Sequence, residues 1–310
     1  MSERPDVSTI ILSWNTRDLT KACLEALRSC RAGSPLTHET IVIDNASADD
    51  SVAMIRSEFP EVRLFKNDAN LGYAKGVNQG LKLARGRFLM LLGSDTEVRP
   101  RTIEAMARFL EEHADVGAVA PRLVYPDGRP QRSCMRFPNL ETALWYDTFL
   151  ELWKPENDVL RSYFYKDWNH EGSREVDQPP GTCLLVRREV VEAVGPMDRK
   201  LWLLFNDVDW CKRIRNAGWR IWYLHEGTEV AHHLGGSTRK YGQFPAEWHR
   251  NRQHFYRKHF HYMGAAIVKA ALLYVVIREV IRIRKNLEST REFLKHARQI
   301  VRAGLDVIFH

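Results

Sequence analysis

Four short apolar segments alternate with helical patterns in the first third of this 310-residue chain, and this alternation constrains its fold most. Residues 7–13 read Val-Ser-Thr-Ile-Ile-Leu-Ser, a β-branched run typical of a buried parallel strand. Further strands are expected at 39–43, 62–66 and 87–92, with a helix after residue 15 and others at about 51–59 and 75–86. This order predicts an α/β fold with a mostly parallel central sheet flanked by helices.

Polar residues follow each of these four strands, at the point where the strand ends. They are Asn15, Asp44, Asn70 and Asp95. Because ligands of open α/β sheets bind beyond the carboxyl ends of the strands, we expect these side chains to converge on one crevice. A single Asx residue in such a place is better explained as a cap of the next helix. Four successive polar ends favour a binding site.

Carboxylates and histidines form a second pattern, spread over the rest of the chain. They are Asp95, Asp207, Asp209, His232 and His233. Asp95 could bind a divalent metal that neutralises a diphosphate. Glycosyl transfer to an alcohol needs a base for the acceptor hydroxyl and stabilisation of the leaving diphosphate. An aspartate base with an Asp/His metal site would supply both, although paired aspartates at a helix start are also common caps.

Several common nucleotide and hydrolase motifs are absent from the sequence. No G-x-G-x-x-G follows the first strand, which argues against a dinucleotide fold. No G-x-x-x-x-G-K-[ST] occurs, so the chain is not expected to be a P-loop NTPase. Neither H-E-x-x-H nor a nucleophile elbow is present. The net charge of +7 favours anionic partners, without choosing between nucleotide phosphates, an anionic membrane and nucleic acid.

The motifs taken together resemble glycosyltransferase family 2, with the GT-A fold, and most closely its rhamnosyltransferase branch. The matching segments occur in the family's order and span roughly residues 7 to 240. They are residues 7–15, 41–49, 70–80, 91–97, 181–188, 206–213 and 230–237. Several independent motifs in the right order make the resemblance specific. It implies a hexosyltransferase that binds a nucleotide-sugar donor.

The resemblance also implies a role for particular residues. Asp207 would be the catalytic base, deprotonating the acceptor hydroxyl as that oxygen displaces the diphosphate in one inverting step. Asp44 would bind the nucleotide base, while Asp95 and His232 would hold Mg²⁺ or Mn²⁺, with His233 as the alternative ligand. The complete expected donor site is Ser13, Asn15, Asp44, Asn70, Gly72, Lys75, Asn78, Ser94 and Asp95.

Two positions depart from the family pattern. Gly93 replaces the first carboxylate of the Asp-x-Asp element, so the metal is expected to bind weakly or to arrive mainly with the donor. Asn206 replaces the glutamate before the base, which removes a charge that would raise the pKa of Asp207. We therefore expect this base to titrate lower than is typical of the family. Asp209 is expected to orient the loop or to cap the following helix.

The substrates follow from the resemblance alone. The rhamnosyltransferase branch points to dTDP-L-rhamnose, and UDP- and GDP-sugars are alternatives because Asp44 can pair with thymine or uracil. The expected acceptor is a membrane-linked glycan or glycolipid intermediate of the cell envelope. A non-catalytic nucleotide-sugar-binding scaffold is a competing interpretation, against which the retained Asp207 argues.

The composition changes after about residue 243, so we divide the chain into a glycosyltransferase domain at 1–245 and a helical extension at 246–310. The apolar run at 265–277 is cut by Lys269 and is too short to span a bilayer. It fits a helix at the membrane interface, with basic residues meeting anionic lipid. A helix packed on the domain, or a contact in a homo-oligomer, is the alternative. The basic residues match no nucleic-acid-binding motif, so no nucleic acid partner is expected.

The remaining features bear on the middle of the chain and on its location. Residues 126–180 are aromatic and weakly periodic, which predicts loops and short helices over the crevice. The five cysteines have no metal-ligand spacing and are interpreted as reduced thiols. The polar N-terminus does not resemble a signal peptide. We expect a cytoplasmic protein, peripheral at the inner face of the cell membrane.

Overall fold

The computed structural model describes residues 4–235, 244–286 and 290–309, and the chain forms two compact units. The first comprises Met1–Met135, Trp168–Trp202 and Asn206–Gly242, and the second comprises Arg136–Asp167, Leu203–Phe205 and Gln243–His310. The domain boundary expected at residue 245 stays a prediction.

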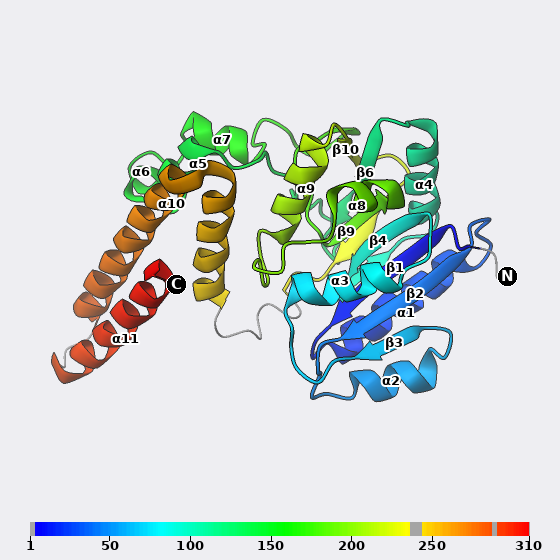
Figure 1. Cartoon of the computed structure of the whole chain (residues 1–310), viewed down its shortest axis with the longest axis horizontal. Helices are drawn as coiled ribbons and strands as arrows, with labels where there is room; N and C mark the ends of the chain where they lie inside the picture. Colours follow the sequence, from blue (N-terminus) through cyan, green and yellow to red (C-terminus); the bar gives the residue numbers. More distant parts are fainter. Residues whose placement is uncertain (1–3, 236–243, 287–289, 310) are drawn as a thin grey trace. The chain divides into compact units, whose positions relative to one another are not determined.

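The first unit is built on an eight-stranded sheet with the order β3–β2–β1–β4–β9–β6–β10–β8 (Figure 1). Its strands are β1 (Val7–Ser13), β2 (His38–Asp44), β3 (Arg63–Lys66), β4 (Phe88–Gly93), β6 (Val116–Pro121), β8 (Arg174–Glu175), β9 (Cys183–Arg187) and β10 (Arg220–Leu224). Strands β1 to β4 are parallel, β9 lies antiparallel between β4 and β6, and β10 is parallel to β6. The predicted mostly parallel sheet is confirmed.

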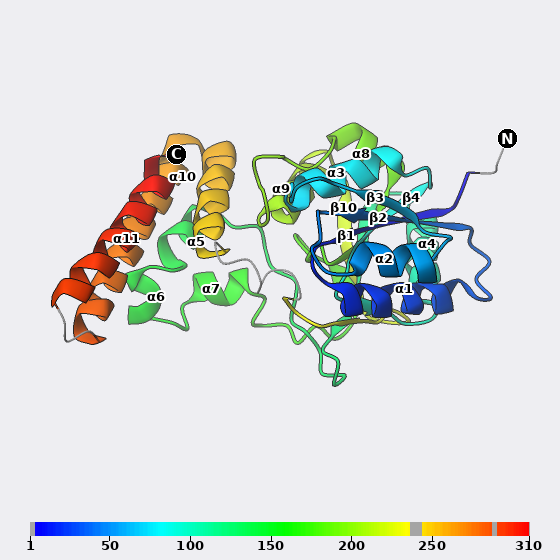
Figure 2. The same ribbon diagram turned by 90° about the horizontal axis from the view of Figure 1, so that it is seen from below.

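Helices cover both faces of this sheet. They are α1 (Arg17–Arg31), α2 (Ser51–Glu58), α3 (Tyr73–Leu83), α4 (Thr102–Glu112), α8 (Arg188–Val194) and α9 (Asn206–Asn216). In the view of Figure 2, α1 and α2 lie below the sheet, and α3 and α8 lie above it. Val7 and Ile11 of β1 pack into one core with the apolar faces of α1, α2 and α4.

The other face of β1 is covered by α3 at unusually close range. A Cβ atom at Gly76 would lie 2.3 Å from Leu12, and one at Gly80 would lie 2.3 Å from Ile10. Both glycines are therefore required for the helix to approach the strand. This packing explains why glycines recur four residues apart on α3, at Gly76 and Gly80.

A smaller sheet of three strands completes the first unit. Its strands are β5 (Thr96–Val98), β7 (Leu123–Val124) and β11 (Val230–His232). The central strand β11 runs antiparallel to β5 and parallel to β7, with His232 opposite Thr96. All five cysteines of the chain are buried in the first unit and are free thiols.

The second unit is helical. It contains α5 (Leu140–Trp145), α6 (Phe149–Trp153), α7 (Asp158–Tyr163), α10 (Phe244–Asn286) and α11 (Thr290–Phe309). Helix α10 is interrupted at His261, whose φ of 55° is not helical, and it packs against both α5 and α11. The buried Arg252 ties α10 to α5, because its guanidinium donates to the carbonyl of Ala143 at 3.2 Å and to that of Tyr146 at 2.8 Å. Among the described helices, none is long and apolar enough to cross a membrane.

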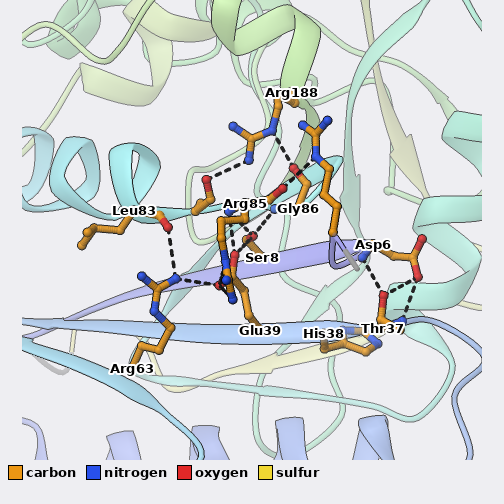
Figure 3. A network of polar contacts seen from close by, with 12 residues as sticks. Asp6, Ser8, Thr37, His38, Glu39, Arg63, Leu83, Arg85, Gly86 and Arg188 are labelled. Atoms are coloured by element: carbon orange, nitrogen blue, oxygen red, sulfur yellow. Dashed lines mark hydrogen bonds and ion pairs between the residues drawn. The ribbon is translucent and has the colours of Figure 1, made fainter. Parts of the chain in front are cut away.

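A buried carboxylate joins the amino ends of three strands of the large sheet (Figure 3). Glu39 of β2 accepts hydrogen bonds from the Ser8 hydroxyl, from the backbone N–H of Arg85 at 2.6 Å and from the Arg63 guanidinium at 2.7 Å. The N–H of Gly86 donates in turn to the Ser8 hydroxyl at 2.6 Å. Burial alone would raise the pKa of Glu39, but these hydrogen bonds outweigh it and lower the pKa.

Replacing Glu39 by glutamine is expected to lower the free energy of unfolding by about 2 kcal/mol, because hydrogen bonds to a buried charge are lost. Both arginines around it are partly exposed, so solvent screens their share. A group whose pKa is lowered on folding stabilises the fold above its unfolded pKa and ceases to do so in acid. The difference between wild type and variant in urea unfolding should therefore shrink below about pH 4.

The matched control for this measurement is Glu61→Gln, at an exposed ion pair with Arg28. This variant is expected to change stability by less than about 1 kcal/mol. Equal losses at Glu39 and Glu61, or a difference that does not depend on pH, would contradict the structural role of Glu39.

Candidate active site

The ends of β1 and β2 are joined by the side chains that follow them. Asn15 has a left-handed backbone with a φ of 54°, and its side-chain oxygen accepts from the N–H of Ala48 at 2.7 Å. Its own N–H donates to the Ser47 hydroxyl at 2.9 Å. The N–H of Ser47 donates to the carboxylate of Asp44 at 2.9 Å. These bonds fix the turn after β2 against the end of β1.

The segment after β3 is held against the same turn. The amide of Asn45 donates to the side chain of Asn70 and to the carbonyl of Gly72, both at 3.2 Å. Asn70 also accepts from the N–H of Gly72 at 3.0 Å, and Gly72 has a φ of 81°. A Cβ atom at Gly72 would lie 2.5 Å from the Trp202 ring, so only glycine fits there.

A cluster of four buried hydroxyls joins the end of β1 to the end of β4. Thr16 lies within 3.3 Å of the Ser13 hydroxyl and within 3.1 Å of those of Thr20 and Ser94. Ser94 directly precedes Asp95. The four polar strand ends that the sequence singles out therefore lie together at the carboxyl edge of the sheet.

Asp44 is fully buried at this edge and is incompletely satisfied. One carboxylate oxygen, Oδ1, accepts from Ser47, whereas Oδ2 is buried without a hydrogen-bond partner among the described residues. A buried acceptor without a donor is unfavourable by about 1–3 kcal/mol. The N–H group of a bound ligand would relieve this cost.

Asp95 lies beside one histidine of the pair His232–His233, at the end of β11. Its Oδ2 is 3.7 Å from Nε2 of His232. Neighbouring residues of a strand point to opposite faces, and the ring of His233 instead lies 2.7 Å from the Glu97 carboxylate. The N–H of His233 donates to the carbonyl of Asp95 at 2.9 Å, which holds the two segments together. Of the two candidate ligands, His232 is the one beside Asp95.

The Asp95–His232 pair can hold one divalent ion. Oxygen and nitrogen ligands lie about 2.1 Å from such an ion, so two ligand atoms 3.7 Å apart can share it. No group of three or more His, Cys, Asp or Glu side chains with metal-binding geometry occurs in the described part of the chain. Water and the oxygens of a bound diphosphate could supply further ligands.

The absence of a side chain at Gly93 leaves room for the carboxylate of Asp95. A Cβ atom at residue 93 would lie 2.9 Å from Oδ1 of Asp95, closer than real contacts allow. The carboxylate of Asp95 therefore occupies space that a side chain at the first Asp-x-Asp position would need. Gly236 and Ser237, the end of the last family motif, lie outside the described residues.

Asp207 lies in the first turn of α9, where a negative charge is favoured by the helix dipole. Its Oδ2 accepts from the N–H of Gly181 at 3.0 Å, and its Oδ1 accepts from the N–H of Val208 at 2.9 Å. The Tyr73 hydroxyl donates to the carbonyl of Gly181 at 3.0 Å. Burial raises the pKa of Asp207 above its ordinary value although these N–H groups act to lower it.

The raised pKa of Asp207 bears on the expectation, drawn from Asn206, that this base titrates lower than is typical of the family. Loss of the neighbouring charge removes one cause of a high pKa, but burial supplies another. Asn206 is itself buried and accepts from the N–H of Asp207 at 2.8 Å, so it fixes the backbone of the base.

The neighbouring Asp209 lies within α9, where it is held by an ion pair. It is fully buried and forms an ion pair with Arg213 one turn later, with Nε 3.0 Å from Oδ2. Arg213 also donates to the carbonyl of Pro196 at 2.8 Å. Asp209 therefore ties α9 to the segment that follows α8.

One residue of the expected donor site, Asn78, is surrounded by protein backbone instead of facing an open pocket. The amide of Asn78 is buried, donating to the carbonyl of Met197 at 2.8 Å and accepting from its N–H at 2.9 Å. Both ends of this amide are therefore already engaged with the backbone of Met197. Lys75, three residues earlier on α3, is exposed to solvent.

Some residues at this edge carry functions that sequence reasoning did not assign. Gly181 binds the carboxylate of Asp207, Tyr73 binds the carbonyl of Gly181, and Trp202 covers Gly72. Gln131 contacts His232 from a segment without periodicity. Gly181 lies inside a family motif, which could have identified it from the sequence. No motif or periodicity in the sequence points to Gln131.

Comparison with known proteins gives a consistent match. The sequence model of the family described as "Glycosyl transferase family 2" matches residues 8–195. The chain is 29% identical over 217 residues to the N-acetylglucosaminyl-diphospho-decaprenol L-rhamnosyltransferase of Mycobacterium tuberculosis (strain CDC 1551 / Oshkosh). That match covers 66% of this chain and 69% of the relative.

Solved structures with the same fold are more distant in sequence. The mannosyltransferase PcManGT from Pyrobaculum calidifontis, in complex with GDP-Man and Mn²⁺, has a TM-score of 0.56 at 14% identity, over 99% of this chain and 88% of that one. S. aureus TarS 1-349, in complex with UDP-GlcNAc, has a TM-score of 0.54 at 16% identity, over 98% and 72%. The chain spans 43% of a longer TarS structure. These likenesses confirm the expected GT-A fold.

Proposed function

Since this chain belongs to glycosyl transferase family 2, and is therefore a glycosyltransferase, we propose that it transfers a sugar with inversion and that Asp207 is its general base. The observation that carries the proposal is the environment of Asp207. Its carboxylate is oriented by two backbone N–H groups, and burial raises its pKa. The N–H of Gly93 donates to the carbonyl of Thr182 at 2.7 Å. This bond connects the segment that binds Asp207 to the end of β4, which leads to Asp95.

The proposed step is a single displacement. The acceptor oxygen attacks the anomeric carbon and forms the new glycosidic bond, while the bond from that carbon to the diphosphate breaks. The proton of the acceptor hydroxyl passes to Asp207. Each carboxylate oxygen keeps lone pairs beyond those that accept from Gly181 and Val208, so the side chain can be oriented and basic at once.

Asp95 and His232 are proposed to hold Mg²⁺ or Mn²⁺, which would neutralise charge on the leaving diphosphate. An imidazole ligand favours Mn²⁺, since Mg²⁺ prefers oxygen ligands alone. The mannosyltransferase of similar fold was solved with Mn²⁺, which agrees with this choice.

The proposed donor is dTDP-L-rhamnose. The M. tuberculosis relative is named an L-rhamnosyltransferase, and Oδ2 of Asp44 lacks the donor that a thymine or uracil N–H would supply. UDP- and GDP-sugars are the alternatives, since related folds were solved with UDP-GlcNAc and GDP-Man. Further donor contacts are proposed for Asn15, Asn70, Gly72, Lys75 and Ser94. Ser13 and Asn78, already bonded, are proposed to hold these segments in place.

The proposed acceptor is a lipid-linked glycan of the cell envelope. The name of the M. tuberculosis relative describes an acceptor built on diphospho-decaprenol. A hydroxyl on such a molecule becomes available only close to a membrane, so the enzyme would work there.

Helices α10 and α11 offer a surface suited to that location. Leu273, Ile277 and Ile281 follow one face of α10, and Leu294, Val301 and Leu305 follow one face of α11; all six are 39% to 52% exposed. Arg298 and Arg302 lie beside the apolar side chains of α11. Residues 246–310 carry 13 lysines and arginines against five acidic residues. We propose that this apolar and basic surface binds the anionic face of the membrane peripherally.

Replacing Asp207 by asparagine is expected to lower kcat by about 10²- to 10⁴-fold, the usual contribution of general base catalysis. Donor affinity, measured by calorimetry, should stay unchanged. In the wild type, kcat/KM should fall as the pH drops through the raised pKa of Asp207, because only the ionised carboxylate accepts the proton.

The control for this variant is Asp127→Asn, at an exposed carboxylate paired with Arg129. It should retain full activity. Turnover by Asp207→Asn within a few-fold of wild type would exclude Asp207 as the base.

A panel of nucleotide sugars tests the proposed donor by thermal shift. With Mn²⁺ present, dTDP-L-rhamnose is expected to raise Tm more than UDP- or GDP-sugars do. Without the metal, dTDP-L-rhamnose should raise Tm by less than it does with Mn²⁺. Asp44→Asn should abolish the preference for thymine or uracil over guanine, while both proteins bind Mn²⁺–diphosphate equally. A larger shift with a GDP-sugar would contradict the assignment of the donor.

Flotation with lipid vesicles tests the membrane surface on the full chain. Binding is expected to need anionic lipid, and Arg298→Gln with Arg302→Gln should weaken it about thirtyfold, at roughly 1 kcal/mol for each basic residue. Ile277→Asn with Leu305→Asn should also reduce it. The control is Phe65→Asn, at an exposed apolar side chain of the first unit. If the wild type does not float, but forms a dimer that the variants lose, the surface binds a second copy instead.

A further inference from the structure

Gln131 is a buried side chain in the first unit that neither the family motifs nor the proposed chemistry includes. It is 5% exposed and lies seven residues after β7. Its backbone N–H donates to the carbonyl of Leu123 at 2.9 Å, which fixes the residue to the small sheet. The central strand of that sheet, β11, ends with His232.

The side chain of Gln131 makes two hydrogen bonds, both to the same residue. Its Nε2 donates to the backbone carbonyl of His232 at 2.8 Å. Its Oε1 lies 3.0 Å from Nδ1 of the His232 ring. One planar amide thus holds both the backbone and the imidazole of a single residue.

These two bonds determine which ring nitrogen carries the proton. A carbonyl oxygen only accepts, so the amide nitrogen, and not the amide oxygen, must face the carbonyl of His232. The amide oxygen is then opposite Nδ1, and it can only accept. Nδ1 must therefore carry a hydrogen, and in the neutral ring Nε2 keeps its lone pair.

The nitrogen that keeps its lone pair is Nε2, which faces Asp95, the other proposed metal ligand. Nε2 of His232 lies 3.7 Å from Oδ2 of Asp95. A ring with the proton on Nε2 could not coordinate an ion through that atom. Free neutral histidine prefers the proton on Nε2, so the protein has to impose the opposite tautomer here.

We infer that Gln131 is a positioning residue that holds His232 in the Nδ1–H tautomer with Nε2 available to a divalent cation. This inference rests on the proposed function, because the metal is part of it. A histidine that binds metal generally donates its second N–H to a protein acceptor, and loss of that acceptor weakens metal binding about 10- to 100-fold. Gln131 supplies the acceptor and, through its N–H group, also fixes the strand.

The first experiment is made on metal-free protein. The chain contains 12 histidines, so ¹⁵N NMR of imidazole-labelled protein is assigned to His232 by comparison with His232→Asn. At alkaline pH the wild type is expected to show the proton on Nδ1. Gln131→Met, of similar length but without polar atoms, should shift the ring towards the Nε2–H form. Gln131→Glu keeps an acceptor opposite Nδ1 and should keep the wild-type tautomer.

The second experiment measures Mn²⁺ binding by electron paramagnetic resonance in the presence of a nucleoside diphosphate. Gln131→Met is expected to raise the Kd for Mn²⁺ about 10- to 100-fold. Gln178→Met is the control, since Gln178 is also 5% exposed in the first unit. It should leave both the tautomer and the Kd unchanged, whatever its effect on stability.

The outcomes separate this inference from the proposed function. A wild-type His232 with its proton on Nε2 would overturn the inference even if no variant folds. An unchanged tautomer in Gln131→Met would also overturn it. If the tautomer shifts as expected while wild type and variant bind Mn²⁺ equally or not at all, the control of the tautomer stands. In that case the metal site of the proposed function is wrong.

Discussion

The hydrogen bond from the N–H of Gly93 to the carbonyl of Thr182 connects the two sides of the candidate site. Gly93 ends β4 and leads to Asp95, whereas Thr182 follows Gly181, whose N–H holds Asp207. The bond forms because β9 runs antiparallel to β4 and begins where β4 ends. A parallel strand at this position would begin at the opposite edge, and its preceding loop could not meet Asp95.

Much of the site is organised by side chains that bind backbone at long range. Gln131 and His232 are 101 residues apart, Asn78 and Met197 are 119 apart, and Tyr73 and Gly181 are 108 apart. The bond of Gln131 holds His232 beside Asp95, and that of Tyr73 holds Gly181, whose N–H binds Asp207. The geometry of the site therefore depends on the backbone and side chains that hold these residues.

The sequence predicted the elements whose pattern is local. Strand β1 has the predicted bounds, and the polar ends of the first four strands lie together because parallel strands end at one edge. Helix α3 was predicted to end near residue 86 but ends at Leu83. Arg85 and Gly86 instead donate their N–H groups to Glu39 and Ser8, and no local pattern reveals these distant acceptors. Gln131 was missed for the same reason, since its partner is known only from the fold.

The anomeric configuration of the product tests the central claim most directly. The reaction would be followed by ¹H NMR with dTDP-L-rhamnose and an acceptor that carries a diphosphate-linked N-acetylglucosamine. A single displacement assisted by Asp207 predicts that the new glycosidic bond has the configuration opposite to that of the donor. A first-formed product that retains the configuration of the donor would contradict the account, because retention requires a second displacement or a different attacking group.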